Sequence, residues 1–390
     1  MFAEDQAAPA NALLAQSGSS NCRISSFSVV AVQQNSKSEA VVTSSISDVA
    51  KRADASAGHG LAADPIQFRN IAGRWLMFSD YGPLAQRHMA TVWSCTFACA
   101  LVDAVWLPNS RLHFSASNWT GFLQGIICCA LAGIFVAAAS RRLRRDESLP
   151  AIALRRTLIL TEFLWRAALP LGALLAAGTT LSYLITSADL PLADALLASV
   201  DRAFGFDWPG FLNATNSSPF LVELLTSAYQ TTDRVIVLVL VWLALQRRGE
   251  RLAEFMAILS LSTVALCVGM LLLPAAGAFA FFGPAPELFG NYSAQGQLWP
   301  FAQAFTMLRN GTLAVIDLSA LQGIVSFPSF HTMLGIMTTY ALRDTRWLFI
   351  PVLLLNATMI VSALPVGGHH LADVLAGAGL TFAAILLVRR

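Results

Sequence analysis

Eight apolar stretches follow one another along the chain after residue 89, and they restrict its fold more than any other feature. A helix needs an apolar stretch of about 20 residues to cross about 30 Å of hydrocarbon, because its backbone polar groups must all be satisfied within the segment. The stretches run approximately 90–108, 119–139, 158–186, 219–246, 252–273, 329–342, 347–364 and 369–388, and the sixth is short for a crossing. The sequence therefore predicts an all-α, polytopic membrane helical bundle.

The composition agrees with a chain whose main solvent is lipid. Hydrophobic residues make up 56% of the sequence and charged residues 12%, whereas a soluble domain carries about 25% charged residues. The net charge of +2 is small and scattered, which excludes a nucleic-acid-binding surface, since such surfaces cluster their basic residues. Of six cysteines all but Cys22 lie in apolar stretches, where cysteine acts as a small hydrophobe. We expect no disulfide framework, no metal site and no cofactor.

Residues 1–85 differ in kind from the rest of the chain. They are rich in Ser, Ala, Asn and Gln and lack a sustained apolar periodicity, so we predict a disordered N-terminal tail. No basic segment leads into an apolar one there, and a cleaved signal peptide is therefore not supported.

Arginine clusters alternate with the apolar stretches and predict the orientation of the chain. Four clusters follow alternate spans, in the segments 141–145, 247–251, 343–346 and 389–390. Because basic residues favour the cytoplasmic side, all four are assigned to the inside, together with the N-terminal tail. The segments 109–118, 187–218, 274–328 and 365–368 then lie outside.

Three of the six histidines lie in two short motifs, each at the outer end of a predicted span. His331 ends the sequence Phe-Pro-Ser-Phe-His, and His369 and His370 begin the sequence His-His-Leu-Ala-Asp that ends at Asp373. The predicted orientation, which used neither motif, brings His331 and His369 to the same outer face although they are far apart in the sequence.

Two helix N-termini that point into one outer pocket favour a bound anion, because they present unpaired N–H groups and the positive end of the helix dipole. In such a pocket one imidazole can attack phosphorus and form a phosphohistidine, while the other protonates the leaving oxygen. Asp373 follows His369 by four residues and shares its helical face. It can hold the other ring N–H of His369, and Ser329 can donate a hydrogen bond to a phosphoryl oxygen.

These Pro-Ser-x-His and His-x-x-x-Asp elements resemble the second and third motifs of the type 2 phosphatidic acid phosphatase (PAP2) superfamily. The resemblance covers roughly residues 158–388 and implies metal-free phosphoryl transfer through a phosphohistidine. It makes His369 the nucleophile, His331 the general acid, Asp373 the orienting carboxylate and Ser329 a phosphate contact. The sequence around the two motifs is more similar to the inositol phosphorylceramide synthase-like branch than to the soluble acid phosphatases. That branch transfers a phosphoryl headgroup between lipids.

The resemblance also implies a domain organisation. The last six spans would form a six-helix PAP2-like catalytic core within residues 155–390. Residues 86–145 would then contribute two additional transmembrane helices N-terminal to that core, and we have no sequence-based account of their purpose.

The family's phosphate-binding cations are not all present. Its third motif usually starts with Ser-Arg, whereas here Ser362 is followed by Ala363, and its first motif is not recognisable. Because a cation is needed to offset charge on the phosphoryl oxygens, we predict that Arg309 binds the substrate, with Arg202 as the next candidate. His370 is predicted to be a substrate contact or a supporting residue.

Each motif also has a structural interpretation. Pro328 and Ser329 are typical of a helix start in which the serine is the cap. His369 and Asp373 could form a polar pair at the membrane interface, or a metal site with His331 as third ligand. A non-catalytic relative that binds or transports lipids is the alternative to an enzyme.

We predict a lipid phosphate phosphatase or a phospholipid headgroup transferase of the inositol phosphate type. Its partner would be a lipid phosphate in the membrane, and its expected place is the bacterial inner (plasma) membrane with the active site facing the periplasm. The motifs do not separate hydrolysis from transfer, and the sequence does not indicate an oligomeric state.

Overall fold

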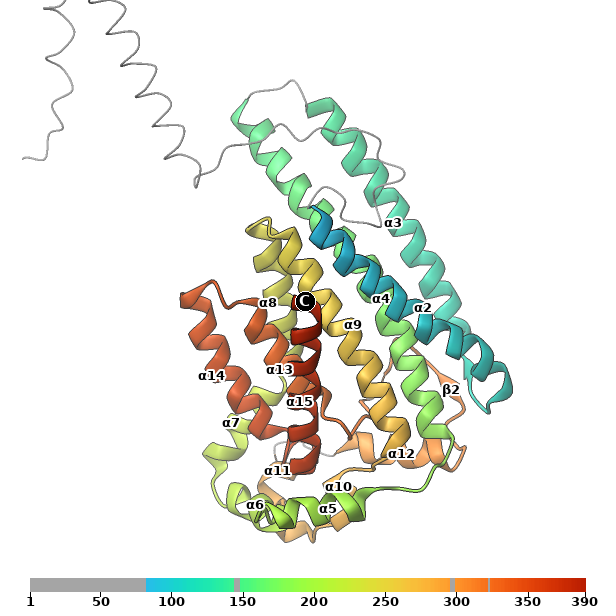
Figure 1. Ribbon diagram of the computed structural model, residues 1–390, viewed down its shortest axis with the longest axis vertical. Helices are drawn as coiled ribbons and strands as arrows, with labels where there is room; N and C mark the ends of the chain where they lie inside the picture. Colours follow the sequence, from blue (N-terminus) through green and yellow to red (C-terminus); the bar gives the residue numbers. More distant parts are fainter. Residues whose placement is uncertain (1–81, 144–147, 295–298, 322) are drawn as a thin grey trace, which may run out of the picture. The chain divides into compact units, whose positions relative to one another are not determined.

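The computed structural model describes residues 82–143, 148–294, 299–321 and 323–390, and most of these residues are helical (Figure 1). The helices are α2 (Pro83–Trp106), α3 (Ala116–Arg142), α4 (Leu149–Ser187), α5 (Asp194–Ala203), α6 (Trp208–Asn216), α7 (Pro219–Tyr229), α8 (Thr232–Leu245), α9 (Gly249–Leu272), α10 (Ala278–Phe282), α11 (Gly290–Ala294), α12 (Pro300–Arg309), α13 (Phe330–Ala341), α14 (Arg346–Ser362) and α15 (Leu371–Arg389). Two short 3₁₀ turns, Leu107–Asn109 and Pro286–Leu288, and two strands, β1 (His113–Phe114) and β2 (Val315–Ile316), complete the described elements. The prediction of an all-α polytopic fold is confirmed.

The eight predicted spans correspond to helices, but they are not equally able to cross a bilayer. Within the described residues, five helical segments are long and apolar enough, and they correspond to α2 with the 3₁₀ turn after it, α3, the part of α4 from Leu160 onward, α9 and α15. The fourth predicted span is the pair α7 and α8, which is bent by 44° at its break. The seventh, α14, has 17 residues and the sixth, α13, has 12, so α13 is only about 18 Å long at 1.5 Å per residue. By length and composition, five of the eight predicted spans qualify among the described residues, or six if the bent pair α7 and α8 counts as one.

The first two spans pack on the helices of the predicted core. Helix α2 lies against both α4 and α9, and α3 contacts α4. Buried residues of α2, such as Met89 and Val92, share one apolar cluster with residues of α4, α8, α9, α13, α14 and α15. Helix α2 starts three residues inside the predicted tail, at Pro83, and residues 1–81 of that tail lie outside the described residues.

Ion pairs join the arginine clusters of two different turns at one end of the bundle. After α13, Arg343 binds Glu254 of α9 with an N···O distance of 2.7 Å. Asp344 of the same turn accepts from Arg251 and, at 3.0 Å, from Arg248, which immediately precedes α9. These clusters, assigned to one side of the membrane from the sequence, thus lie side by side, at the opposite end of α13 from His331.

The other end of the bundle carries the short helices α5, α6, α10, α11 and α12 (Figure 1). Strands β1 and β2 pair in parallel there, with His113 opposite Val315. Asn118 at the start of α3 extends this link, since its side chain donates to the Ile316 carbonyl at 2.7 Å and accepts from Leu318 N at 2.9 Å. The two additional helices are therefore attached to the long segment that precedes α13.

Helices α13 and α15 touch backbone to backbone at their starts. Ser329 N donates to the Asp373 carbonyl at 2.9 Å, which joins the residue before α13 to the first turn of α15. Gly377 lies one turn further along α15, and a Cβ atom at that position would come within 2.5 Å of the Ser329 carbonyl oxygen. The absence of a side chain at residue 377 thus allows the two helices to bring both histidine motifs together.

We expect Gly377→Ala to destabilise the protein, because its Cβ meets backbone that can yield only if the start of α13 moves. Overpacking of this kind costs about 1–3 kcal/mol. Gly379→Ala is the matched control on the same helix, since a Cβ there meets nothing within 4 Å, and alanine is favoured over glycine in a helix by up to about 1 kcal/mol. The measurement is the midpoint of thermal unfolding in detergent. Equal midpoints for the two variants would contradict this account.

Candidate active site

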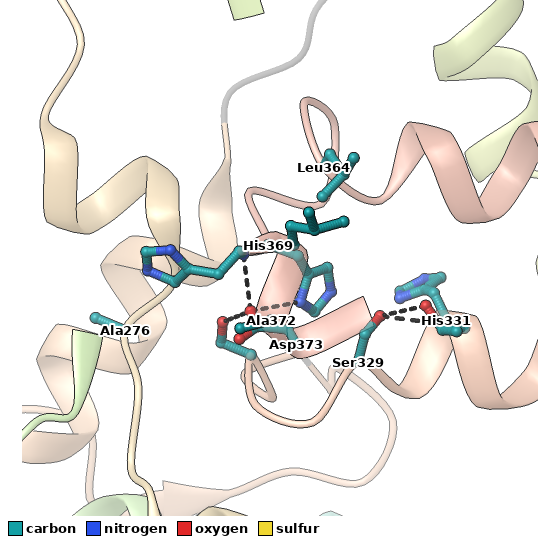
Figure 2. Close-up of polar contacts among 12 residues, drawn as sticks. Ala276, Ser329, His331, Leu364, His369, Ala372 and Asp373 are labelled. Carbon is teal, nitrogen blue, oxygen red and sulfur yellow. Dashed lines mark hydrogen bonds and ion pairs between the residues drawn. The ribbon is translucent and has the colours of Figure 1, made fainter. Parts of the chain in front are cut away.

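His331 and His369 face each other across the junction of α13 and α15. His331 lies in the first turn of α13 and His369 two residues before α15, and their ring centroids are 6.3 Å apart with an angle of 63° between the planes. Figure 2 shows the two rings on neighbouring segments of the chain, with Ser329 beside His331 and Asp373 beside His369. Since reacting atoms approach to about 3–3.5 Å before a bond forms, one phosphoryl group between the rings can reach both. The predicted convergence of the two motifs is confirmed.

His369 is oriented by Asp373. Its Nδ1 lies 3.3 Å from Oδ2 of Asp373, and the two side chains are 3% and 0% exposed. The same Oδ2 atom accepts from the Ser326 hydroxyl and from His370 N, both at 2.9 Å. Because Nδ1 is held by the carboxylate, Nε2 is the nitrogen of His369 that can attack an electrophile. Sequence reasoning did not assign Ser326 a role, and its polar side chain three residues before the Ser329 cap was the available signal.

His331 has a different partner, which the sequence analysis missed. The hydroxyl of Tyr229, the last residue of α7, lies 3.3 Å from Nδ1 of His331. The two rings are also stacked, with centroids 4.2 Å apart and an angle of 24° between their planes. The polar residues Gln230, Thr231 and Thr232 interrupt an apolar stretch at this point, and that interruption was the only signal in the sequence.

Ser329 is the N-cap of α13 and is fully buried. Its hydroxyl oxygen lies 3.4 Å from the backbone nitrogen of Thr332 and accepts from the Thr332 hydroxyl at 3.1 Å. This geometry agrees with the structural interpretation of Pro328 and Ser329, in which the serine is the cap of a helix start. A contact between Ser329 and a phosphoryl oxygen stays a prediction, and the cap uses the Ser329 oxygen only as an acceptor, which leaves its O–H group free to donate.

Gly367 and Gly368 allow the segment before α15 to pass close to His369 and Tyr229 on one side and to Phe279 on the other. A Cβ at Gly367 would lie 2.8 Å from Cδ2 of His369 and 3.1 Å from Cε2 of Tyr229. Gly368 has a φ of +66°, a value that favours glycine, and a Cβ there would lie 2.9 Å from Phe279. Both positions are therefore closed to other residue types without movement of the site.

An aromatic layer covers this segment at the end of the bundle that carries the short helices. Trp208 of α6 donates from Nε1 to the Leu364 carbonyl at 3.0 Å, and Trp299 donates to the Pro365 carbonyl at 3.2 Å. Phe279 stacks on Trp299 with ring centroids 4.1 Å apart. These bonds satisfy carbonyls at the end of α14 that burial would otherwise leave without partners.

Two aspartates of α5 bind the start of α15. Asp201 accepts from Leu371 N at 3.2 Å, from Ala372 N at 2.8 Å and from Nδ1 of His370 at 3.0 Å. Asp194 accepts from the backbone nitrogens of residues 276 and 277, both at 2.9 Å, and lies 3.5 Å from Nε2 of His370. Their spacing of seven residues on one amphipathic helix was the sequence signal for this pair, and it was not used.

This arrangement corrects the expectation that the helix N-termini offer free N–H groups to a phosphate. The first N–H groups of α15 bind Asp201, and Ser329 caps the first turn of α13. The physical reason is that N–H groups buried at a helix start must find acceptors within the protein. His370 likewise points to Asp201 and Asp194 and is 0% exposed, a position that suits a supporting residue better than a substrate contact.

Arg309 is engaged elsewhere in this structure. Its Nη2 binds Oδ1 of Asp189 at 2.6 Å and donates to the Leu190 carbonyl at 2.8 Å. Among the described residues, no ion pair or hydrogen bond joins Arg309 to His331, His369 or Asp373. It does line a small cavity, of about 10 Å³, together with Ser326, so it lies on the Asp373 side of the site. Arg202, the next candidate, is exposed.

The metal alternative finds no support in the ligand geometry. In the ranges that the structure describes, no three His, Cys, Asp or Glu side chains form a group that could hold a metal ion.

The family model of the PAP2 superfamily matches residues 195–387, just under half of the 390-residue chain. The match begins in α5 and ends in α15, so it includes both histidine motifs, Asp373 and Tyr229. No curated protein sequence and no solved structure matches the chain.

The cluster around His370 predicts a pH dependence of stability. Burial alone lowers the pKa of His370, but the carboxylates of Asp194, Asp373 and Asp201 outweigh it and hold this pKa above the ordinary value. A raised pKa means that the stabilisation is complete below the unfolded-state value of about 6.5 and is lost as the pH rises through the higher, folded-state value. We expect the unfolding midpoint of the wild type to fall with rising pH in this window, and that of His370→Gln to depend on pH less. His113→Gln, at an exposed position on β1, is the control, and equal slopes for wild type and His370→Gln would contradict the assignment.

Proposed function

We propose that this chain is a PAP2-type membrane enzyme that cleaves a phosphate ester of a lipid through a phosphohistidine at His369. The observation that carries the proposal is the 6.3 Å separation of the His331 and His369 rings, with a buried carboxylate behind only one of them. The superfamily match over residues 195–387 supports the same chemistry.

In the first half-reaction Nε2 of His369 attacks phosphorus, and the bond between phosphorus and the lipid oxygen breaks. His331, in its protonated form, gives a proton to that oxygen, so the lipid leaves as an alcohol. Positive charge develops on the imidazole of His369 as the P–N bond forms, and Asp373 at 3.3 Å stabilises it.

In the second half-reaction an acceptor hydroxyl attacks the phosphohistidine. His331, now neutral, removes the proton of that hydroxyl as the P–N bond breaks, and the proton returns His331 to its starting state. Water as acceptor completes a hydrolysis, and an alcohol completes a transfer. The two outcomes share every step up to the phosphoenzyme.

The charge around the site favours a phosphodiester over a phosphomonoester as the substrate. The predicted outer segments contain three arginines, Arg111, Arg202 and Arg309, and Arg309 is paired with Asp189. A phosphodiester carries one negative charge, whereas a phosphomonoester carries about 1.5 to 2 at neutral pH and needs more cationic compensation. A phospholipid headgroup of the inositol phosphate type therefore suits this site, in agreement with the resemblance to the inositol phosphorylceramide synthase-like branch. Arg309 stays our candidate for a phosphoryl contact, a role in which it would exchange Asp189 for the substrate.

The site would face the non-cytoplasmic side of the membrane. The arginine-rich turns and the two histidines lie at opposite ends of α13, and basic residues favour the cytoplasmic side. We propose a bacterial inner membrane with the reaction at its periplasmic face.

We expect His369→Ala to abolish both turnover and covalent labelling of the protein by radioactive phosphatidylinositol or phosphatidic acid. His113→Ala, at an exposed histidine, should retain the wild-type rates. The measurement is release of diacylglycerol and trapping of the labelled phosphohistidine after an acid-free quench. A product that carries the phosphoryl headgroup on an added alcohol would identify a transferase.

Two results would reject this proposal. Unchanged turnover in His369→Ala would exclude the nucleophile. Tight binding of lipid phosphates by the wild type, without turnover or labelling across the panel, would favour a non-catalytic relative that binds or transports lipids.

A further inference from the structure

We propose that Tyr229 is the positioning residue of His331 and that it restricts this histidine to acid–base work while Asp373 makes His369 the nucleophile. The inference rests on the proposed function and adds a residue that lies outside both histidine motifs. It follows from the different partners of the two imidazoles.

Tyr229 contacts the reacting end of the site from a third helix. Its hydroxyl is 3.3 Å from Nδ1 of His331, and its ring is stacked on the imidazole at 4.2 Å between centroids. The Cε2 edge of the same ring and Cδ2 of His369 lie 3.1 and 2.8 Å from the position that a Gly367 Cβ would take. Tyr229 thus lies beside both motifs at once.

The end of α7 holds Tyr229 in this place. Helix α7 stops at Tyr229, and α8 continues after a bend of 44°. The hydroxyl of Thr232 donates back to the Tyr229 carbonyl at 2.9 Å, which satisfies a carbonyl that the break in the helix frees. The Tyr229 side chain is partly buried between α13 and Gly367, so its ring has little freedom to turn away from His331.

A tyrosine hydroxyl suits a histidine that must gain and lose a proton in every cycle. Its oxygen can accept from Nδ1–H both when the imidazole is protonated and when it is neutral, so the proton that is gained and lost is the one on Nε2. In both states Nε2 remains directed at the oxygen that leaves or attacks. A carboxylate in the same place would stabilise the imidazolium far more than the neutral imidazole, which is the behaviour needed at His369 and not at His331.

The stacked ring contributes a second effect. An imidazolium over the face of a tyrosine gains a cation–π interaction of about 0.5–2 kcal/mol, and this interaction is present only while His331 is protonated. The tyrosine ring thus stabilises the protonated form of His331 but still allows it to lose the proton. The hydroxyl keeps the imidazole oriented so that Nε2 points at the substrate oxygen.

The test uses three variants and pairs of substrates that transfer the same group. Tyr229→Phe removes the hydroxyl and keeps the ring, whereas Tyr229→Leu removes both. Tyr340→Phe is the matched control, since it removes a hydroxyl that donates to Glu254 at 3.0 Å, at the other end of α13. Phosphatidylinositol is paired with the p-nitrophenyl ester of inositol phosphate, and phosphatidic acid is paired with p-nitrophenyl phosphate.

The readout is the burst of first product, which reports formation of the phosphoenzyme. General acid catalysis contributes about 10²–10⁴-fold to a rate, so misplacing the acid in Tyr229→Phe should slow the burst from the lipid by about 10- to 100-fold. The nitrophenolate leaves without a proton, and its burst should therefore change by less than about 3-fold. Tyr229→Leu should lose more on the lipid than Tyr229→Phe, and Tyr340→Phe should match the wild type on both substrates.

A purely structural role for Tyr229 would slow the lipid and its p-nitrophenyl partner equally, and that result would overturn the inference. So would a wild-type burst from the lipid in Tyr229→Phe. Either outcome leaves the proposed function intact if the wild type forms a phosphoenzyme and His369→Ala does not. Absence of a phosphoenzyme in the wild type would reject both proposals together.

Discussion

The contact between the starts of α13 and α15 is the interaction on which the site depends. Neither helix start can be left with unsatisfied backbone groups once it is buried. The bond from Ser329 N to the Asp373 carbonyl, and the close approach at Gly377, satisfy that requirement and bring two distant segments into one polar junction. The histidines are near each other because their helices meet here.

The two imidazoles differ in what surrounds them. His369 is almost fully buried against a carboxylate that also binds Ser326 and the backbone of His370. His331 is less buried and has an aromatic hydroxyl as its partner. A buried carboxylate favours a positive charge on its neighbour, whereas a hydroxyl accommodates either protonation state. Similar residues can therefore serve as nucleophile and as acid on opposite sides of one phosphoryl group.

The short helices α5 and α6, together with α2 and α3, hold this junction in place. Asp201 and Asp194 of α5 join the start of α15 to the segment that follows α9, and the tryptophans of α6 and of the segment before α12 bind the end of α14. The additional helices α2 and α3 join the same assembly through α4, α9 and the strand pair. Carboxylates that cap a helix start hold it in place, but they also take up the N–H groups that a phosphate could otherwise bind.

The sequence by itself determined the helical membrane fold, the approximate positions of the long apolar helices and the convergence of His331 and His369, because apolar length and arginine spacing are local properties. It also predicted the pair His369 and Asp373, but the contact is not made along one helical face as expected, because His369 lies two residues before α15 and reaches back to the first turn of that helix. Only the tertiary structure decided that Tyr229, Ser326 and Asp201 contact the two histidine motifs and that Arg309 binds Asp189. These features depend on which side chains meet across helices, and a periodic apolar pattern specifies that a face is buried without specifying what it is buried against.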